Sequence, residues 1–535
     1  MHRPSSDRLL LLGGLVLLGV TATLAFVTRP LIPLDETRYA GVAWEMWTRG
    51  DFLVPFKNGE PYSDKPPLLF WLIHAGWALF GVSDWWPRAI SPIFAAVSLV
   101  LTWRIAHALW PDHPGLAGRS IVVLMTSLMW MLFSTALMFD VLLTFCVLLG
   151  MLGIIMARDG RSRGFAVLGL ALGAGVLAKG PVIFLHLLPV ALLAPWRHPP
   201  VDRMRWLGGL ALAVAIGAGI ALAWAIPAAM RGGEAYRDAI LWGQTADRMV
   251  ESFAHRRPVW WYLPLLPGVL FPWFVWPRMW QALRDEMRRG FDPGLRFCLA
   301  WMLPVFVTFS LVSGKQPHYL VPLFPAFALL AARVLTRAVA TPRGTFAPTT
   351  VAVLVGFVLT MAALGQLSWA RDEGLHDPPV WVGIALMLAG LGALFAARER
   401  ATPFARVAFI GATTFLLTHH AVMQMIVPRY DLAPMARAIQ AVQASGAPVA
   451  NVANYHGQYQ FLGRLEAPLA ELSPDALPAW ALAHPEGYAV IYLKNEKTWR
   501  EAVEPLHVQA YRGGVAALVA ATDLGALGDL SAPSR

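Results

Sequence analysis

The sequence is short of cysteine, of charge and of nucleotide-binding motifs. Its 535 residues include two cysteines, Cys146 and Cys298, and both lie in apolar runs. So few cysteines exclude a disulfide framework and a cysteine-based zinc site. Charged residues make up 14% of the chain, against about 25% in an ordinary soluble domain. This scarcity excludes a disordered protein and a typical soluble enzyme.

What the chain has in abundance is apolar surface with a basic balance. Hydrophobic residues make up 57% of the chain, and the formal net charge is +10. The 23 tryptophans and 41 prolines are typical of aromatic anchors and interrupted helices at a membrane interface. We therefore predict a polytopic membrane protein.

The apolar runs predict thirteen spans with the N-terminus inside and the C-terminus outside. A helix needs roughly 20 residues to cross the hydrocarbon core, and Leu9 to Val27 is the first such run. It lacks a convincing cleavage site, so we expect an uncleaved span. The shorter run Leu68 to Gly81 is expected along the interface, because a span there would move the arginine-rich loops outside. The spans are expected near 9–27, 87–108, 119–138, 141–157, 164–178, 181–195, 206–228, 260–277, 297–313, 318–333, 347–369, 380–397 and 406–426.

The composition changes at Pro428, which divides the chain into a membrane domain, 1–427, and an outer domain, 428–535. In the second part we predict helices over 431–445 and 495–503, and strands over 449–453 and 488–493. This indicates a small α/β domain. It contains neither a G-x-G-x-x-G motif after a strand nor a P-loop, so no nucleotide is assigned.

Most charged residues outside the inner loops fall in segments predicted at one membrane face. The first outer loop, about 28–86, is the richest, and others are Asp140, Lys179 and the segment 313–319. Lysine and arginine at headgroup level attract lipid phosphates, and carboxylates among them indicate a base or an orienting group. For each of these residues taken singly, the alternative is a charged loop side chain that is merely solvated and has no role in a site.

Two stretches of the first outer loop resemble a known family. Asp35-Glu36-Thr37-Arg38-Tyr39 and Tyr62-Ser63-Asp64-Lys65-Pro66-Pro67-Leu68 look like the signature of the lipid A aminoarabinose transferases, the ArnT-like enzymes. These are polyprenyl-phosphate-dependent glycosyltransferases of the GT-C fold, related to protein O-mannosyltransferases. Supporting matches are Arg88, Asp140, 177–181 and 315–322. The resemblance implies an all-α polytopic membrane domain followed by the small α/β domain.

The resemblance also implies roles for individual residues. Asp35 would be the catalytic carboxylate, supported by Asp140. The residues that would hold lipid phosphate are Arg38, Lys65, Arg88, Lys179, Arg256, Arg257 and Lys315. Those that would line the substrate cavity are Glu36, Tyr62, His318 and Tyr319.

A metal site is left open at the sequence level. His255 either joins Asp64 in a structural divalent-metal site, such as zinc, or has a structural role without metal. Many relatives have Glu where this chain has Asp64, and one His with one carboxylate falls short of the three protein ligands usual for catalytic zinc. No cofactor is therefore assigned.

The resemblance implies a bacterial inner-membrane enzyme that moves an amino sugar from undecaprenyl phosphate to a lipid A phosphate at the periplasmic face. Aminoarabinose, glucosamine and galactosamine all remain compatible with the residues. One alternative is the same fold acting on a protein hydroxyl or another glycolipid. The other is a lipid or solute transporter, which we disfavour because the charges gather at one face and no internal repeat is evident. Membrane lipids are expected partners and nucleic acid is not.

Overall fold

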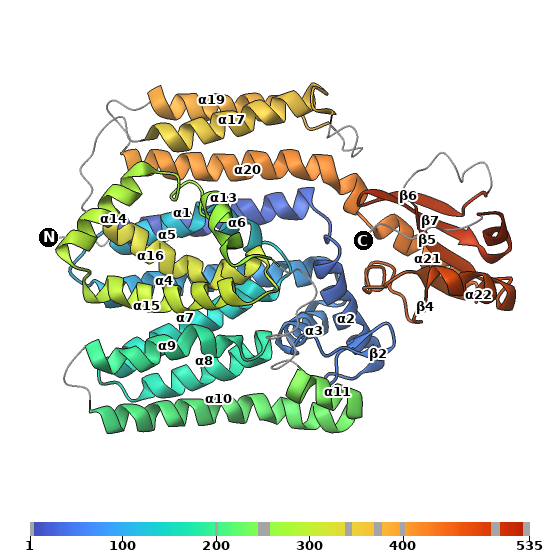
Figure 1. Cartoon of the computed structure of the whole chain (residues 1–535), viewed down its shortest axis with the longest axis horizontal. Helices are drawn as coiled ribbons and strands as arrows, with labels where there is room; N and C mark the ends of the chain where they lie inside the picture. Colours follow the sequence, from blue (N-terminus) through green and yellow to red (C-terminus); the bar gives the residue numbers. More distant parts are fainter. Residues whose placement is uncertain are drawn as a thin grey trace.

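The structure is a computed structural model that describes residues 5–197, 202–243, 257–336, 345–368, 377–395, 402–493 and 503–527. A bundle of long helices carries a small α/β domain at one end, which we call the domain end (Figure 1). The N-terminus of the chain lies at the other end, and so does α14 (Pro277–Arg289), which carries Arg284, Arg288 and Arg289.

The bundle consists of helices whose side chains are apolar almost all round, as membrane helices are. α1 (Ser5–Thr28) has 24 residues and is therefore about 36 Å long, enough to cross a hydrocarbon core. The other main helices are α4 (Trp85–Leu109), α7 (Phe139–Arg158), α8 (Arg163–Lys179), α9 (Val182–Arg197), α10 (Arg203–Arg231), α15 (Pro293–Leu311), α16 (Phe324–Leu335), α17 (Phe346–Ala363), α19 (Val380–Phe395) and α20 (Pro403–Tyr430). Within the described residues, eight helices are long and apolar enough to span a membrane. The chain is thus a multi-pass membrane protein, while the count of thirteen stays a prediction.

Two segments predicted as single spans are broken. Residues 119–138 form α5 (Leu116–Met125) and α6 (Leu128–Phe133), which are separated by Thr126 and Ser127. The hydroxyls of these two residues bond the carbonyls of Val122 and Val123, and the Leu128 N–H turns to the carbonyl of Phe271. The helix is interrupted here because the Leu128 N–H, which a continuous helix would direct to the carbonyl of Leu124, bonds that of Phe271 instead.

The second broken segment is 260–277. It forms the 3-10 helix η2 (Val259–Leu265), the short helix α13 (Leu266–Val269) and a turn before α14 begins at Pro277. Pro264, Pro267 and Pro272 each lack the N–H that a continuous helix needs. These prolines were visible in the sequence and were a signal for the break.

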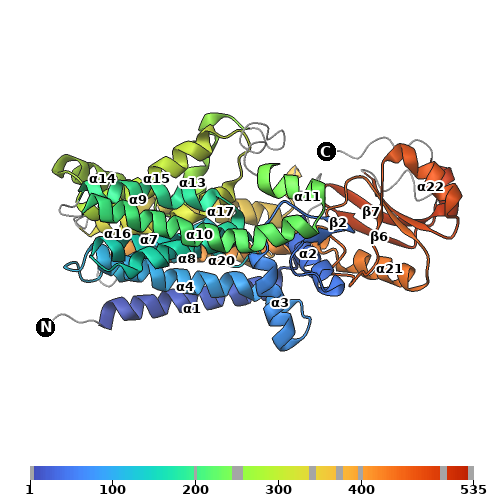
Figure 2. The same cartoon turned by 90° about the horizontal axis from the view of Figure 1, so that it is seen from below.

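α3 (Leu68–Phe80) does not run with the bundle. It lies across the helix direction at the domain end, beside α2 (Asp35–Arg49), as Figure 2 shows. The prediction that 68–81 lies along the interface agrees with this orientation. Between the two helices a short hairpin pairs β1 (Phe56–Lys57) with β2 (Glu60–Pro61).

The C-terminal domain is a five-stranded mixed sheet in the order β4-β3-β5-β7-β6. Its strands are β3 (Val449–Val452), β4 (Ala470–Leu472), β5 (Tyr488–Leu493), β6 (His507–Tyr511) and β7 (Gly514–Ala520). β3 runs parallel to β4 and β5, whereas β7 runs antiparallel to β5 and β6. The predicted strands 449–453 and 488–493 are confirmed, and the predicted helix 495–503 falls mainly outside the described residues.

The helices α21 (Ala433–Ala444) and α22 (Leu477–Ala483) cover the two faces of this sheet. Alternate strand residues point to opposite faces. Val490 and Leu518 therefore pack with α21, while Ile491 and Val519 pack with α22 and the 3-10 helix η7 (Ala521–Leu527). The predicted helix over 431–445 corresponds to α21. α20 continues through Pro428 and ends at Tyr430.

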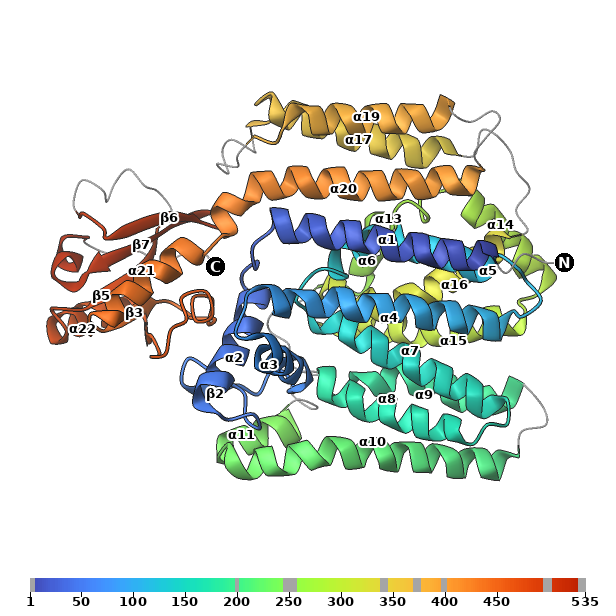
Figure 3. The same cartoon turned by 180° about the vertical axis from the view of Figure 1, so that it is seen from behind.

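The C-terminal domain is docked on the first outer loop (Figure 3). Trp44 of α2 donates from its indole to the carbonyl of Leu465 at 2.9 Å. Asn58, between β1 and β2, exchanges two hydrogen bonds with Leu469. Trp77 of α3 stacks on Phe461 with ring centroids 5.3 Å apart. These contacts place the domain directly above the residues of α2.

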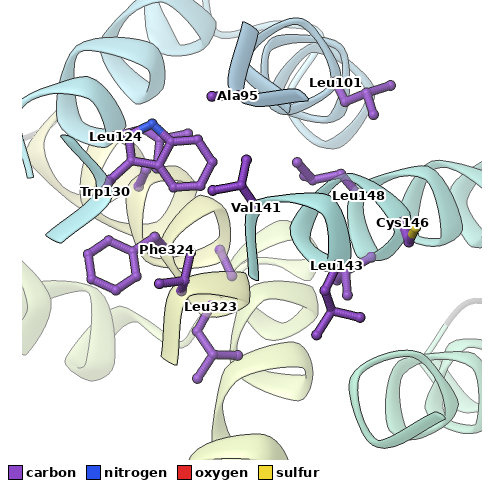
Figure 4. Packing of buried hydrophobic residues seen from close by; sticks show 14 of the residues in the cluster. Ala95, Leu101, Leu124, Trp130, Val141, Leu143, Cys146, Leu148, Leu323 and Phe324 are labelled. Carbon is purple, nitrogen blue, oxygen red and sulfur yellow. The ribbon is translucent and has the colours of Figure 1, made fainter. Parts of the chain in front are cut away.

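The main core lies among α4, α5, α6, α7 and α16. Figure 4 shows buried side chains of this cluster, among them Trp130, Val141 and Phe324. Val141 follows Asp140 directly, so the start of α7 is held in close-packed surroundings that tolerate little movement.

Candidate active site

The first carboxylate of the site stands at the N-terminus of α2. Asp35 is the first residue of this helix, where the helix dipole favours negative charge. Its Oδ1 accepts a hydrogen bond from the hydroxyl of Tyr39 at 3.2 Å and pairs with the guanidinium of Arg38. Spacings of three and four residues place all three on one helix face. The Asp35 side chain stays 44% exposed, so it is held in orientation and still accessible.

Tyr39, which the sequence shows only as part of the motif Asp35 to Tyr39, is a further functional candidate. It is 3% exposed, and burial, followed by the neighbouring Asp35 carboxylate, raises the pKa of Tyr39 well above its usual range. The phenol therefore stays protonated at neutral pH and remains a donor to Asp35. The i,i+4 spacing from Asp35 was the signal that could have singled it out.

The second carboxylate, Asp140, lies in the first turn of α7 and is 1% exposed. Its Oδ1 is 2.5 Å from Nζ of Lys179, the last residue of α8. Nζ of Lys179 also lies 5.0 Å from the ring centroid of Tyr319. A buried carboxylate requires such a partner, so this ion pair is a fixed feature of the site.

His318 is near enough to both carboxylates to feel their charges. It lies in the 3-10 helix η3 (Pro317–Leu323), with its ring 4.8 Å from that of Tyr319. The charges of Asp140, Lys179, Asp35 and Lys65 all act on its imidazole.

Tyr62 is close enough to Arg38 and Tyr39 to interact with them electrostatically. Residues far apart in sequence thus form one group, which we call the Asp35 cluster. Its members are Asp35, Arg38, Tyr39, Tyr62, Lys65, Asp140, Lys179, His318 and Tyr319.

The side chains of Arg88 and Lys315 are engaged by backbone carbonyls. Arg88 donates to the carbonyls of Ala25 and Arg29 at 2.8 and 2.7 Å. Lys315 is 2% exposed, and its Nζ donates to the carbonyl of Arg257 at 3.0 Å and to that of Val312. These bonds hold α1 to α4, and the segment after α15 to the start of η2. Phosphate binding by either residue stays a prediction.

Glu36 was expected in the substrate cavity, but its side chain is 5% exposed and forms a salt bridge with Arg29 at 3.0 Å. The reason is local, because Glu36 follows Asp35 on the helix and so projects about 100° away from it. Asp35 is left on the accessible side, while Glu36 points into the protein.

The remaining predicted residues concern the metal and one loop. His255 and Arg256 lie outside the described residues, while the exposed Arg257 stands 5.8 Å from the ring of Trp261. In the part of the chain that the structure describes, no three His, Cys, Asp or Glu side chains come together as metal ligands. The pairing of Asp64 with His255 stays a prediction.

Comparison with known proteins places the chain in a family. The profile of the Dolichyl-phosphate-mannose-protein mannosyltransferase family matches residues 64–224. Undecaprenyl phosphate-alpha-4-amino-4-deoxy-L-arabinose arabinosyl transferase 1 of Pseudomonas fluorescens is 31% identical over 389 residues, which are 70% of this chain and 69% of that protein. The chain belongs to this arabinosyl transferase family.

Other members align over a smaller share of their length. The transferase of Enterobacter sp. is 31% identical over 341 residues, 61% of this chain and 60% of that protein. With a Pseudomonas paraeruginosa transferase the identity is 33%, over 57% of this chain and 55% of that protein. The chain thus spans less than two thirds of the length of these relatives.

Solved structures show that the family fold extends over the whole chain. ArnT from Cupriavidus metallidurans bound to undecaprenyl phosphate matches with a TM-score of 0.71 at 21% identity, covering 98% of this chain and 99% of that one. An oligosaccharyltransferase from Archaeoglobus fulgidus matches with a TM-score of 0.52 at 11% identity, covering 92% of this chain and 70% of that one. The expected fold, a helical membrane domain with a small C-terminal α/β domain, is confirmed.

Proposed function

We propose that this protein is a glycosyltransferase that moves 4-amino-4-deoxy-L-arabinose from undecaprenyl phosphate to a phosphate of lipid A. The observation that carries the proposal is the Asp35 cluster, in which the accessible Asp35 carboxylate and the buried Asp140–Lys179 pair are joined by the bond from Tyr39 to Asp35 and the ring contact of Tyr39 with Phe139, the residue before Asp140. The sugar and its carrier are taken from the names of the family members. The membrane carrier agrees with the ArnT neighbour, whose structure contains undecaprenyl phosphate.

The chemistry is a displacement at the anomeric carbon of the sugar. An oxygen of the acceptor forms the new bond to this carbon while the bond to the undecaprenyl phosphate oxygen breaks, and the electron pair leaves with the phosphate. Two anions must approach when a phosphate is the acceptor. Preorganised cations relieve that repulsion and stabilise the leaving group. Arg38 and Lys65 are suited to hold the leaving phosphate.

The role of Asp35 depends on whether the acceptor group is a phosphate or a hydroxyl. The second ionisation of a phosphate monoester has a pKa of about 6, so such an acceptor is already largely ionised at pH 7. Asp35 then orients the acceptor or the cationic amino sugar. A hydroxyl acceptor would instead require Asp35 to take a proton as a general base. The pKa of Tyr39 is well above its usual range, so this residue keeps its own proton and holds Asp35 in position in both cases.

We place the protein in the bacterial inner membrane with the Asp35 cluster facing the periplasm. The arginine-bearing helix α14 lies at the end of the bundle opposite to the cluster. Cytoplasmic loops carry the excess of lysine and arginine, which supports this orientation. A lipid A acceptor would then meet its donor at the outer leaflet of the same membrane.

The test is mass spectrometry of lipid A from cells with the wild-type protein, without it, and with Asp35→Asn. We expect a gain of one amino-pentose in the wild-type cells alone. A mass gain of one hexosamine would mean that the transferred sugar is a hexosamine, while the proposed reaction stands. Unchanged lipid A in cells shown to make the donor lipid would overturn lipid A as the acceptor. Full activity of Asp35→Asn would overturn the site.

A further inference from the structure

Glu36 stands next to Asp35, yet its carboxylate is bonded inside the protein. Its Oε1 accepts from Nη2 of Arg29 at 3.0 Å and from the N–H of Leu137 at 2.6 Å. Its Oε2 accepts from the N–H of Ile32 at 2.8 Å. Glu36 is 4% exposed and Arg29 is 6% exposed. The carboxylate therefore links the start of α2 to a segment about 100 residues later.

That later segment leads directly to Asp140. Three successive backbone groups in it are each held by a buried side chain from a different part of the protein. The carbonyl of Thr135 accepts from Arg29 at 2.9 Å, the carbonyl of Ala136 accepts from Ser91 at 2.5 Å, and the N–H of Leu137 donates to Glu36. Asp140 follows three residues after Leu137, at the start of α7. The ring of Phe139 also packs on that of Tyr39 with centroids 4.8 Å apart.

Arg29 is itself fixed, so the link is rigid at both ends. Its carbonyl accepts from Arg88 at 2.7 Å, and the guanidinium of Arg88 lies over the ring of Phe26 at 4.6 Å. Arg88 thereby supports the network. Charge-assisted hydrogen bonds in a buried network of this kind are stronger than exposed ones and restrict its members to one geometry.

We propose that Glu36 is a positioning residue, which with Arg29 sets the placement of the Asp140–Lys179 pair relative to Asp35 and so the affinity of the site for polyprenyl phosphate. The inference rests on the proposed function, because it concerns the same ligand site. Glu36 acts without contacting the substrate, because its carboxylate already accepts hydrogen bonds from three donors inside the protein.

The experiment is a double-mutant cycle on the affinity of the purified full chain for undecaprenyl phosphate. The four proteins are wild type, Glu36→Gln, Asp140→Asn and the double variant, with Asp140→Glu as the partner if Asn abolishes binding. Residues that act through one another give non-additive losses. We expect Glu36→Gln to weaken binding about tenfold in the wild-type background and less than about twofold in the Asp140 background.

Glu45→Gln is the matched control for folding. Glu45 lies on the same helix, is 7% exposed, pairs with Arg49 at 2.9 Å and accepts from the N–H of Gly59 at 2.7 Å. It has a comparable network but no bond to residues 135–137 among those described. We expect this variant to lose thermal stability and to keep its affinity.

The possible results test the positioning role of Glu36 and the proposed function separately. Equal losses in both backgrounds would overturn positioning and indicate an effect that does not pass through Asp140. A loss of affinity in Glu45→Gln as large as that in Glu36→Gln would overturn it as a general destabilisation of α2. A wild-type chain that binds no undecaprenyl phosphate would overturn the proposed function, and the inference with it.

Discussion

The ion pair between Asp140 and Lys179 offers a prediction that can be worked out from the structure. Lys179→Met leaves the Asp140 carboxylate 1% exposed and without its cation. Removing one partner of a buried pair costs about 3–5 kcal/mol, and the N-terminus of α7 recovers up to about 1 kcal/mol for the remaining carboxylate. The Lys179 side chain is 15% exposed, so solvent screens the pair in part. We therefore expect a loss of about 2–3 kcal/mol in the free energy of unfolding.

The assay is a denaturation titration in mixed micelles, followed by tryptophan fluorescence. In the double variant Lys179→Met with Asp140→Asn the buried charge is gone as well, and stability should return to within about 1 kcal/mol of wild type while transfer activity stays absent. Arg205→Met is the surface control. Its pair with Asp202 spans 3.4 Å between side chains that are 90% and 56% exposed, and such pairs contribute little.

Three results would contradict the reasoning. Lys179→Met as stable as wild type would mean that Asp140 is not an uncompensated buried charge after this substitution. A double variant no more stable than Lys179→Met would mean that the loss comes from packing of the lysine side chain. Recovery of stability together with recovery of activity would show that the pair is structural and has no part in transfer.

Three further predictions concern the surroundings of the site. Gly41→Ala should destabilise the docked C-terminal domain and speed its release by limited proteolysis, because the new Cβ would lie 2.7 Å from a backbone oxygen of that domain; Gly19→Ala, with nothing within 4 Å, should be neutral or stabilising. Burial lowers the pKa of His74 to about 4, so folding favours the neutral imidazole. The contribution of His74 to stability is therefore complete above pH of about 6.5 and is lost as the pH drops toward 4. Thermal scans of His74→Gln should show a flatter dependence of stability on pH. Tyr39→Phe should lower kcat for amino-sugar transfer by the purified protein about tenfold through loss of a bond to a charged acceptor, and an unchanged kcat would contradict this role of Tyr39.

Much of the membrane domain follows from local sequence. The runs that became α1, α4, α7 and α10 are long and apolar, and each was predicted within a few residues of its bounds. The breaks at 126–127 and near 265–276 were missed for different reasons. Prolines mark the second one, whereas the first depends on a carbonyl, that of Phe271, which only the folded chain brings near.

The sequence named candidate residues for the site but not their arrangement. Asp35, Lys65, Asp140 and Lys179 were named from motifs, and the structure pairs Lys179 with Asp140 and Arg38 with Asp35. The resemblance of the motif placed Glu36 in the substrate cavity. Helix geometry turns the adjacent residues Asp35 and Glu36 to different sides of α2. Which of these sides faces solvent and which faces Arg29 depends on the parts of the protein that pack against the helix.

The sequence by itself determined the class of protein, the placement of the main helices and the residue types needed for phosphate chemistry. These depend on hydrophobic length and local periodicity, which act over tens of residues. Only the tertiary structure decided that Lys179 pairs with Asp140, that Glu36 holds the segment before α7, and that the C-terminal domain is docked on α2. Each of these contacts joins residues far apart in the chain, and close packing of specific side chains selects it.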